Sequence, residues 1–233
     1  MAIKVQRAEE RGKAEHDWLH TRFSFSFAKY YNPEKMNFGA LRILNDDIIY
    51  PDSGFPMHPH DNMEIITIVL GGKLEHKDSM GNERIIPAGD IQRMSAGSGI
   101  MHSEFNASKT KKVSLLQIWV FPKEKNIDPN YEQKTFSKKD RKNKFQLIVS
   151  YEKGKGLYIH QDARFLLADL DKSKKIDFVI EKSKGVYVFV IEGKCKVNET
   201  ELNKRNSAEI TEHEKISFNA IENSEIFIIE IPE

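Results

Sequence analysis

The chain has 233 residues, of which 39% are hydrophobic and 30% are charged, and 36 basic against 35 acidic side chains give a formal net charge of +1. Such an even balance provides no overall field that would recruit nucleic acid or anionic lipid. No apolar run approaches the roughly 20 residues of a membrane-spanning helix, and the N-terminus lacks the apolar core of a secretory signal. We therefore expect a cytoplasmic protein, a monomer, that binds neither nucleic acid nor membrane.

The single cysteine, Cys195, excludes an internal disulfide and is consistent with a reducing compartment. It lies in a strand-like stretch at 190–197, so we interpret it as a small strand residue rather than a reactive thiol. Lysines cluster at 134–144, but acidic stretches elsewhere balance them. We interpret this run as a solvated linker rather than a phosphate-binding patch.

The N-terminal half predicts a series of β-strands. Strict alternation of phenylalanine and serine at 23–27 predicts a half-buried strand with its phenylalanines in a core. Extended segments at 38–44 and 48–50 then lead to the motif His-Pro-His at 58–60. Its proline removes a backbone donor and favours an extended conformation at the first histidine. The motif is therefore expected at a strand start or a sheet edge, where a site can open to solvent.

Strand-like runs and turn signals at 64–72, 79–82 and 87–90 separate this motif from His-Ser-Glu at 102–104. This order is expected if the chain leaves one point and returns to it antiparallel. In a strand, side chains two residues apart share a face and lie roughly 6–7 Å apart along it. Each motif therefore presents two metal-type ligands to one side, so that three imidazoles and one carboxylate can converge inside a barrel.

A second half follows an apolar run at 113–121. Residues 123–144 are polar and lysine-rich, which predicts a connecting segment with one short helical turn. Strand-like sequence then continues to Ile231. We therefore predict a metal-binding barrel over 1–122, a linker over 123–144 and a second barrel over 145–233.

A weak internal repeat relates the two halves. Residues 68–75 parallel 190–196, which indicates a duplicated unit. In place of the histidine pair, the second copy reads Ile-Asp-Phe-Val-Ile at 176–180, and near the counterpart of His102 it reads Ala-Ile-Glu-Asn at 220–223. We therefore expect the second barrel to be a degenerate copy without a metal.

Two motifs in the first half resemble those of the cupin family. The first cupin motif is matched by Gly54, His58, His60, Glu64 and Gly71, and the second by Gly89, Gly97, His102 and Asn106. The second motif departs from the family at Ser95, where proline is expected, and its gap before His102 is two residues longer. Within the cupins, the chain resembles a pirin in His-Pro-His-x3-Glu at 58–64, His-Lys-Asp-Ser at 76–79 with Gly81, and the run at 96–104.

The pirin resemblance, which is close over residues 20–120, implies a bicupin: an all-β chain of two tandem antiparallel jelly-roll barrels. It implies one divalent transition metal in the N-terminal barrel, held by His58, His60, His102 and Glu104. Imidazole and carboxylate ligands suit several metals, and we expect Fe(II), with Zn, Ni, Mn and Cu as alternatives. Four protein ligands leave a position open on a six-coordinate ion, which argues against a purely structural zinc.

The residues alone leave two candidates for the carboxylate ligand. On a straight strand Glu64 lies about 13 Å from His60. Glu104 lies only about 7 Å from His102, which favours it as the ligand. A bend at 61–62 would instead bring Glu64 to the metal. Without that bend, Glu64 is expected to be a hydrogen-bond partner near the site or a carboxylate at the barrel mouth.

The pirin resemblance is compatible with two functions. The resemblance implies a quercetin 2,3-dioxygenase-like enzyme that cleaves a flavonol or a related small aromatic with O₂, in which Glu104 also accepts the substrate's hydroxyl proton. The alternative, with which pirins are also associated, is a metal-containing regulatory protein. In that role, the redox state of the metal would control binding to a transcription factor or an enzyme.

The remaining histidines and some apolar residues could also contribute to the site, to the core or to the surface. His76 either orients a ligand from behind or lies on a surface strand. Apolar side chains that could enclose a substrate's rings are Phe23, Phe25, Met101 and Phe105. Four further histidines are interpreted as ordinary core or surface residues: His16, His20, His160 and His213.

Overall fold

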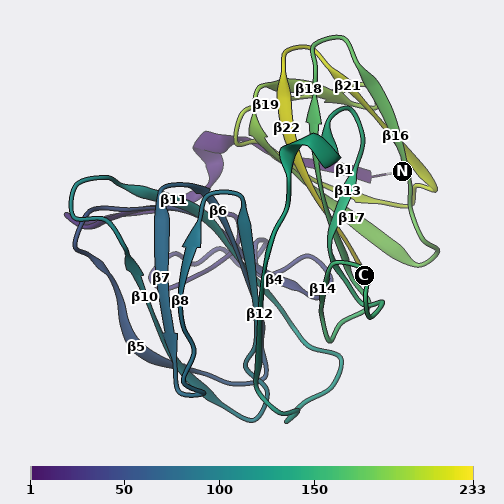
Figure 1. The fold of residues 1–233 in the computed structure, drawn as a ribbon. Helices are drawn as coiled ribbons and strands as arrows, with labels where there is room; N and C mark the ends of the chain where they lie inside the picture. The colour runs from purple at the N-terminus through teal and green to yellow at the C-terminus, as the bar shows by residue number, and fades with distance from the viewer. Residues whose placement is uncertain (1, 233) are drawn as a thin grey trace.

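The computed structural model describes residues 2–232, and nearly every regular element within them is a β-strand (Figure 1). The other regular elements of this range are two short 3₁₀ helices, η1 (Ala8–Glu10) and η2 (Lys138–Arg141). No helix among the described residues is long and apolar enough to cross a membrane. The prediction of an all-β fold is confirmed.

The first half of the chain forms two antiparallel sheets that enclose a barrel lumen. The large sheet consists, in spatial order, of β12 (Asn130–Thr135), β9 (Asp90–Ser95), β6 (Glu64–Gly71), β11 (Val113–Val120), β4 (Leu41–Ile49), β3 (Leu19–Phe23) and β2 (Gly12–Glu15). The small sheet consists of β5 (Gly54–His60), β10 (Ile100–Asn106), β7 (Lys73–Asp78) and β8 (Glu83–Pro87). An apolar cluster joins them, in which Leu74 and Ile86 of the small sheet pack with Val69 and Leu115 of the large one.

The second half repeats this arrangement. Its large sheet consists of β1 (Ala2–Gln6), β20 (Ser207–Thr211), β17 (Lys184–Glu192), β22 (Ser224–Pro232), β15 (Arg164–Leu170), β13 (Gln146–Ser150) and β14 (Leu157–Tyr158). Its small sheet consists of β16 (Lys175–Val179), β21 (Lys215–Ala220), β18 (Lys194–Val197) and β19 (Thr200–Asn203). The prediction of two tandem antiparallel barrels is therefore confirmed, with β13 and β14 forming a parallel pair at one edge.

The two large sheets pack against each other through one shared core. Ile66 and Ile118 of the first half belong to the same buried cluster as Leu167 and Phe227 of the second. Because alternate residues of a strand point to opposite faces, the other face of each large sheet lines its own barrel. Both faces of β6 and β11 are therefore buried, which explains why these strands read as nearly continuous apolar runs.

Two edge strands come from outside the half whose sheet they join. The strand β1 pairs with β20 of the second half, and Figure 1 shows the purple start of the chain among green and yellow strands. The strand β12 lies inside the expected linker 123–144 and pairs with β9 of the first half. An edge strand with one partner needs no apolar alternation, and most residues of β12 are polar. The division into domains stays a prediction, with these two strands crossing its boundaries.

The expected strand at 23–27 is only partly regular. The strand β3 ends at Phe23, and the chain then bends as far as a left-handed Ala28. Phe23 and Phe25 are buried as expected, and Phe25 packs 5.6 Å from the ring of Tyr187 in the core between the halves. Alternation thus located the buried rings but not the end of the strand, because local hydrogen bonds such as Phe27 N–H to Tyr30 oxygen replace sheet pairing.

Aromatic and aliphatic side chains fill the second barrel. The strands β16 and β21 take the places that β5 and β10 have in the first half, and 220–223 lies at or beyond the end of β21 rather than within it. Phe145 packs 5.5 Å from Phe178 and 5.2 Å from Phe218. Cys195 of β18 is fully buried nearby, and burial raises the pKa of its thiol to about 12, which agrees with its interpretation as a strand residue.

Removing one of these rings tests the packing of the second barrel. Phe218 is fully buried, so we expect Phe218→Ala to lower the free energy of unfolding by about 3–5 kcal/mol, as measured by urea denaturation. The control Val179→Ala changes a side chain that is 69% exposed and should alter stability by less than about 0.5 kcal/mol. Similar effects of the two variants would mean that Phe218 does not pack as described.

Candidate metal centre

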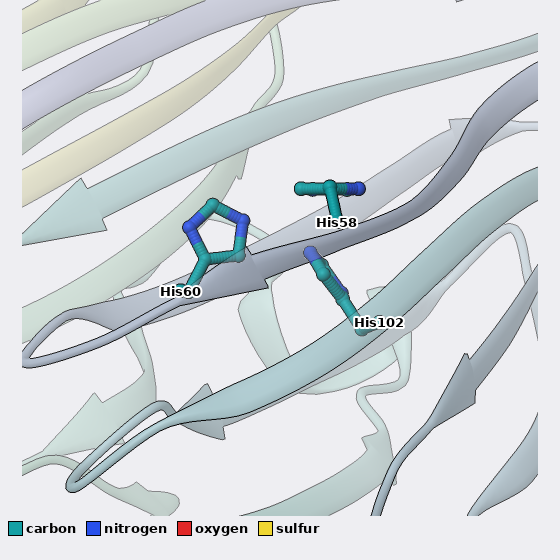
Figure 2. A group of neighbouring side chains, drawn as sticks. All are labelled: His58, His60 and His102. Atoms are coloured by element: carbon teal, nitrogen blue, oxygen red, sulfur yellow. The ribbon is translucent and has the colours of Figure 1, made fainter.

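Three histidines from two neighbouring strands converge at one wall of the first barrel. In the antiparallel pair β5 and β10, His58 and His102 occupy directly opposed positions. His60 lies two residues further along β5 and shares a face with His58. The ring centroids are 4.4–4.9 Å apart, and Figure 2 shows the three side chains turned toward a common point. Candidate ligand nitrogens on the three rings lie within 4.8 Å of one another, which is compatible with a single bound ion.

Unpartnered nitrogens at this point fit a metal. The His102 side chain is 1% exposed, and neither of its ring nitrogens has a hydrogen-bond partner among the described residues. The Nδ1 of His58 lies 2.8 Å from the Pro56 carbonyl oxygen, so it carries the proton and leaves Nε2 free to coordinate. Burial, together with the neighbouring imidazoles, lowers the pKa of His102 to about 2 and that of His60 to about 4. The rings of His60 and His102 are therefore neutral near pH 7, as metal ligands must be.

Glu104 lies two residues beyond His102 on β10 and is also buried. Its Oε2 accepts a hydrogen bond of 2.7 Å from the Gln117 amide, and its Oε1 accepts one of 3.2 Å from the Thr67 hydroxyl. Burial raises the pKa of Glu104 to about 7, against these hydrogen bonds, which lower it. Its carboxylate groups with His102 and His76 rather than with His58 and His60, so His102 is common to two clusters.

Glu64 faces away from this site. Along β6, the side chains of Ile66 and Ile68 point into the core between the halves, and Glu64 shares their face. Its carboxylate accepts a hydrogen bond of 2.9 Å from Ser95 and a longer one of 3.4 Å from the backbone N–H of His160 in the second half. Thr67, which bonds Glu104, points to the opposite side of the same strand. The parity that relates Glu64 to His60 is broken because the chain turns between β5 and β6, with Asn62 in a left-handed conformation.

A row of polar side chains crosses the face of the large sheet that lines the first barrel, next to Glu104. Asn45, Gln117, Thr67 and Gln92 occupy matching positions on the adjacent strands β4, β11, β6 and β9. All four are at least nine-tenths buried. This row cannot be recognised from the sequence, because its signal is one polar residue in each of several apolar strands and the strand order is needed to align them.

A cavity of about 280 Å³ adjoins the histidines. Its walls include Phe27, Phe55, Pro56 and Trp119, and its polar groups include Asn45, Asp47 and the predicted ligands. The Trp119 ring meets His60 edge to face at 4.7 Å. The aromatic wall of this cavity is therefore built from residues other than the four expected from the sequence.

The four apolar residues expected to line the site lie elsewhere. Met101 and Phe105 alternate with His102 and Glu104 on β10, so they point out of the barrel and are 38% and 36% exposed. Phe25 lies in the core between the halves, and Phe23 packs on Phe27 outside the cavity lining. The expectation that these four enclose a substrate is not supported by the cavity.

The other histidines divide as follows. His76 is fully buried on β7, and its Nε2 lies 3.0 Å from Asp78 Oδ2, so it is not a surface residue. It is paired with Glu104 across β7 and β10, and its ring centroid lies 5.5 Å from that of His102. The remaining four stand outside both histidine clusters: His16, His20, His160 and His213.

Two family models match separate parts of the chain. The family model described as Pirin matches residues 4–120, and the model described as Quercetinase C-terminal cupin domain matches residues 147–231. The chain belongs to the pirin family. The bicupin fold expected from the resemblance is also that of the crystal structure of bacterial pirin YhhW from Escherichia coli in complex with nickel(II). That structure is 40% identical, covers 99% of both chains and has a TM-score of 0.95.

Relatives that match over nearly the whole chain are named either as an enzyme or as a pirin. The protein named quercetin 2,3-dioxygenase in Escherichia coli K12 is 41% identical over 99% of both chains. A protein named pirin-like in Caulobacter vibrioides is 40% identical over 95% of this chain and 96% of its own. The pirin described here thus matches these relatives over both barrels and not only over the histidine motifs.

Asp47, in the same cavity, provides a test of the electrostatics. Burial raises its pKa from 3.8 to about 7. A carboxyl group whose pKa is raised by folding stabilises the folded state below its unfolded pKa, and this stabilisation is lost as the pH rises through about 7. The free energy of unfolding of the metal-free protein should therefore decline between about pH 4 and pH 8, and Asp47→Asn should reduce that decline by up to roughly 4 kcal/mol.

Urea denaturation of the metal-free protein across this pH range measures the effect. Glu199→Gln changes an exposed carboxylate and should leave the pH profile as in the wild type. A profile unchanged in Asp47→Asn would show that Asp47 titrates near its ordinary pKa in the folded protein.

Proposed function

We propose that this pirin is a metal-dependent dioxygenase of the quercetin 2,3-dioxygenase type, which cleaves a flavonol or a related small aromatic with O₂. The observation that carries the proposal is the convergence of three histidines beside a cavity with aromatic walls. The names of the full-length relatives support the same reaction. Fe(II) is the metal we assign, with Zn, Ni, Mn or Cu as alternatives, because imidazole and carboxylate ligands do not discriminate strongly among them.

The proposed ligands are His58, His60, His102 and Glu104. The free nitrogens of His58 and His102 support the imidazole part of this set. Glu104 already faces the His102 ring from the same strand, whereas Glu64 faces the other half of the molecule. The nickel(II) complex of the Escherichia coli pirin supports a divalent ion in this family.

A bound metal would supply a Lewis acid that acidifies a coordinated hydroxyl group and a redox centre for reaction with O₂. Glu104 is the group that accepts the hydroxyl proton of the substrate. Gln117 and Thr67 hold its two carboxylate oxygens, which fixes the direction in which it accepts that proton. Their positions on the rigid large sheet keep this orientation constant through turnover.

The aromatic walls perform the binding step. Phe27, Phe55 and Trp119 offer flat apolar surfaces to the rings of a substrate and exclude water from the histidines. Edge-to-face packing of Trp119 on His60 sets the position of one wall relative to the proposed metal.

Metal content tests the ligand set. His102→Ala removes the ring common to both clusters, so we expect metal binding to weaken more than about tenfold, as measured by anaerobic titration and elemental analysis. Glu64→Ala should retain most of the metal, because its carboxylate is bound to Ser95 on the other face of the sheet. Equal losses in Glu64→Ala and Glu104→Ala would remove Glu104 from its assigned role. His213→Ala is the matched histidine control, and a clear drop in that variant would indicate a metal site in the second half.

Turnover tests the reaction itself. Protein loaded anaerobically with Fe(II) and then given quercetin and O₂ should consume both, followed by the flavonol absorbance and an oxygen electrode. Glu104→Gln should lower kcat by about a hundredfold, since a positioned general base contributes about that much or more. Absence of turnover with Fe, Ni, Cu and Mn would reject the flavonol substrate and favour the regulatory alternative.

A further inference from the structure

Two buried oxygens in the cavity have no hydrogen-bond partner among residues 2–232. Asn45 and Asp47 line the cavity from β4 and are 4% and 3% exposed. The Oδ1 atom of each lacks a partner among the described residues. A buried polar atom without a partner is destabilising, so oxygens in this position require water or a ligand that donates hydrogen bonds to them.

The two oxygens occupy a defined place relative to the proposed metal ligands. Asn45 is in register with Gln117, which bonds Glu104, and Asp47 follows two residues later on the same face. Trp119, which packs on His60, is in register with Ile43. Asn45 therefore lies at the level of Glu104, and Asp47 lies further from Trp119 along β4. The stretch from Ile43 to Asp47 spans about 13 Å of the strand.

We propose that Asn45 and Asp47 form a specificity subsite that selects aromatic substrates carrying a hydroxyl group beyond the one that meets the metal. The inference rests on the proposed function, since that function supplies the aromatic class of ligand. The walls accept flat rings, the histidine side takes an oxygen ligand, and this subsite receives a further O–H donor. A polyhydroxylated phenolic compound fits all three features.

The energetic reason lies in the water that the ligand displaces. Without a ligand, the two acceptors depend on water for hydrogen bonds. A ligand hydroxyl replaces those bonds, whereas an apolar ring edge leaves both oxygens unpaired and loses affinity. Burial raises the pKa of Asp47 against a hydrogen bond from Thr21, which lowers it, so the carboxyl group as a whole is incompletely compensated.

Binding of two matched flavonols tests the subsite. Quercetin and 3-hydroxyflavone share a ring skeleton and the same metal-binding oxygens, but 3-hydroxyflavone lacks the other hydroxyl groups. Full-length protein loaded with Zn(II) under anaerobic conditions permits binding without turnover, and ligand absorbance and tryptophan fluorescence report Kd. We expect the wild type to bind quercetin at least about tenfold more tightly than 3-hydroxyflavone, and Asp47→Leu to weaken quercetin about tenfold while changing 3-hydroxyflavone less than about twofold.

Three further variants separate specificity from general damage to the cavity. Asp47→Asn retains an acceptor oxygen and should keep the preference for quercetin. Phe55→Leu shortens an aromatic wall and should weaken both ligands by the same factor. Glu199→Gln, on an exposed turn of the second half, should change neither, and thermal melting together with zinc content checks that each variant is folded and loaded.

The outcomes distinguish this inference from the proposed function. Equal weakening of both flavonols by Asp47→Leu, or a wild type without preference, would overturn the subsite even if the Fe(II) enzyme consumes quercetin. The expected preference without any turnover by the Fe(II) enzyme would support the subsite and reject the dioxygenase. Absence of binding by both flavonols would reject both proposals.

Discussion

The face-to-face packing of the two large sheets is the interaction on which the rest of this structure depends. It buries one side of each sheet in a common core, and the small sheets then cover the opposite sides to make two barrels. A sheet held on both faces cannot shift its register by one residue without turning every side chain to the wrong side. The positions of lumen-facing residues are therefore fixed more firmly than in a sheet exposed to solvent.

That fixed register governs the candidate centre. The histidines come from the small sheet, whereas the groups that orient Glu104 come from the large one. The site thus brings together an edge strand that can open to solvent and a sheet whose central strands are buried on both faces. His60 and His58 are partly exposed on the outer strand, while His102 and Glu104 are buried between the two sheets. Ligand entry and rigid positioning are assigned to different layers of the same barrel.

Much of the fold, and the convergence of three histidines, could be predicted from the sequence, because alternation along strands and the His-x-His spacing are local properties. The choice of Glu104 over Glu64 rested on strand distance, and the structure adds a reason that the sequence could not supply, namely that Glu64 faces the second half. The prediction of the apolar residues around the cavity was wrong. The aromatic residues found there are brought together by the pairing and order of the strands, which the sequence does not reveal: Phe27, Phe55 and Trp119. The strand β12 was missed because an edge strand of polar residues resembles a linker.

The exchange of edge strands makes the halves dependent on each other in sequence as well as in space. The large sheet of the second barrel takes its terminal strand from the very start of the chain, and that of the first barrel takes one from the segment between the halves. During synthesis, the large sheet of the first barrel can therefore be complete only after β12 has been made. The strand β1 is made first, but it can join a complete second sheet only after β22 has been made. A gene cut between the halves would deprive β20 of its outer neighbour and expose its unpaired amides to other chains.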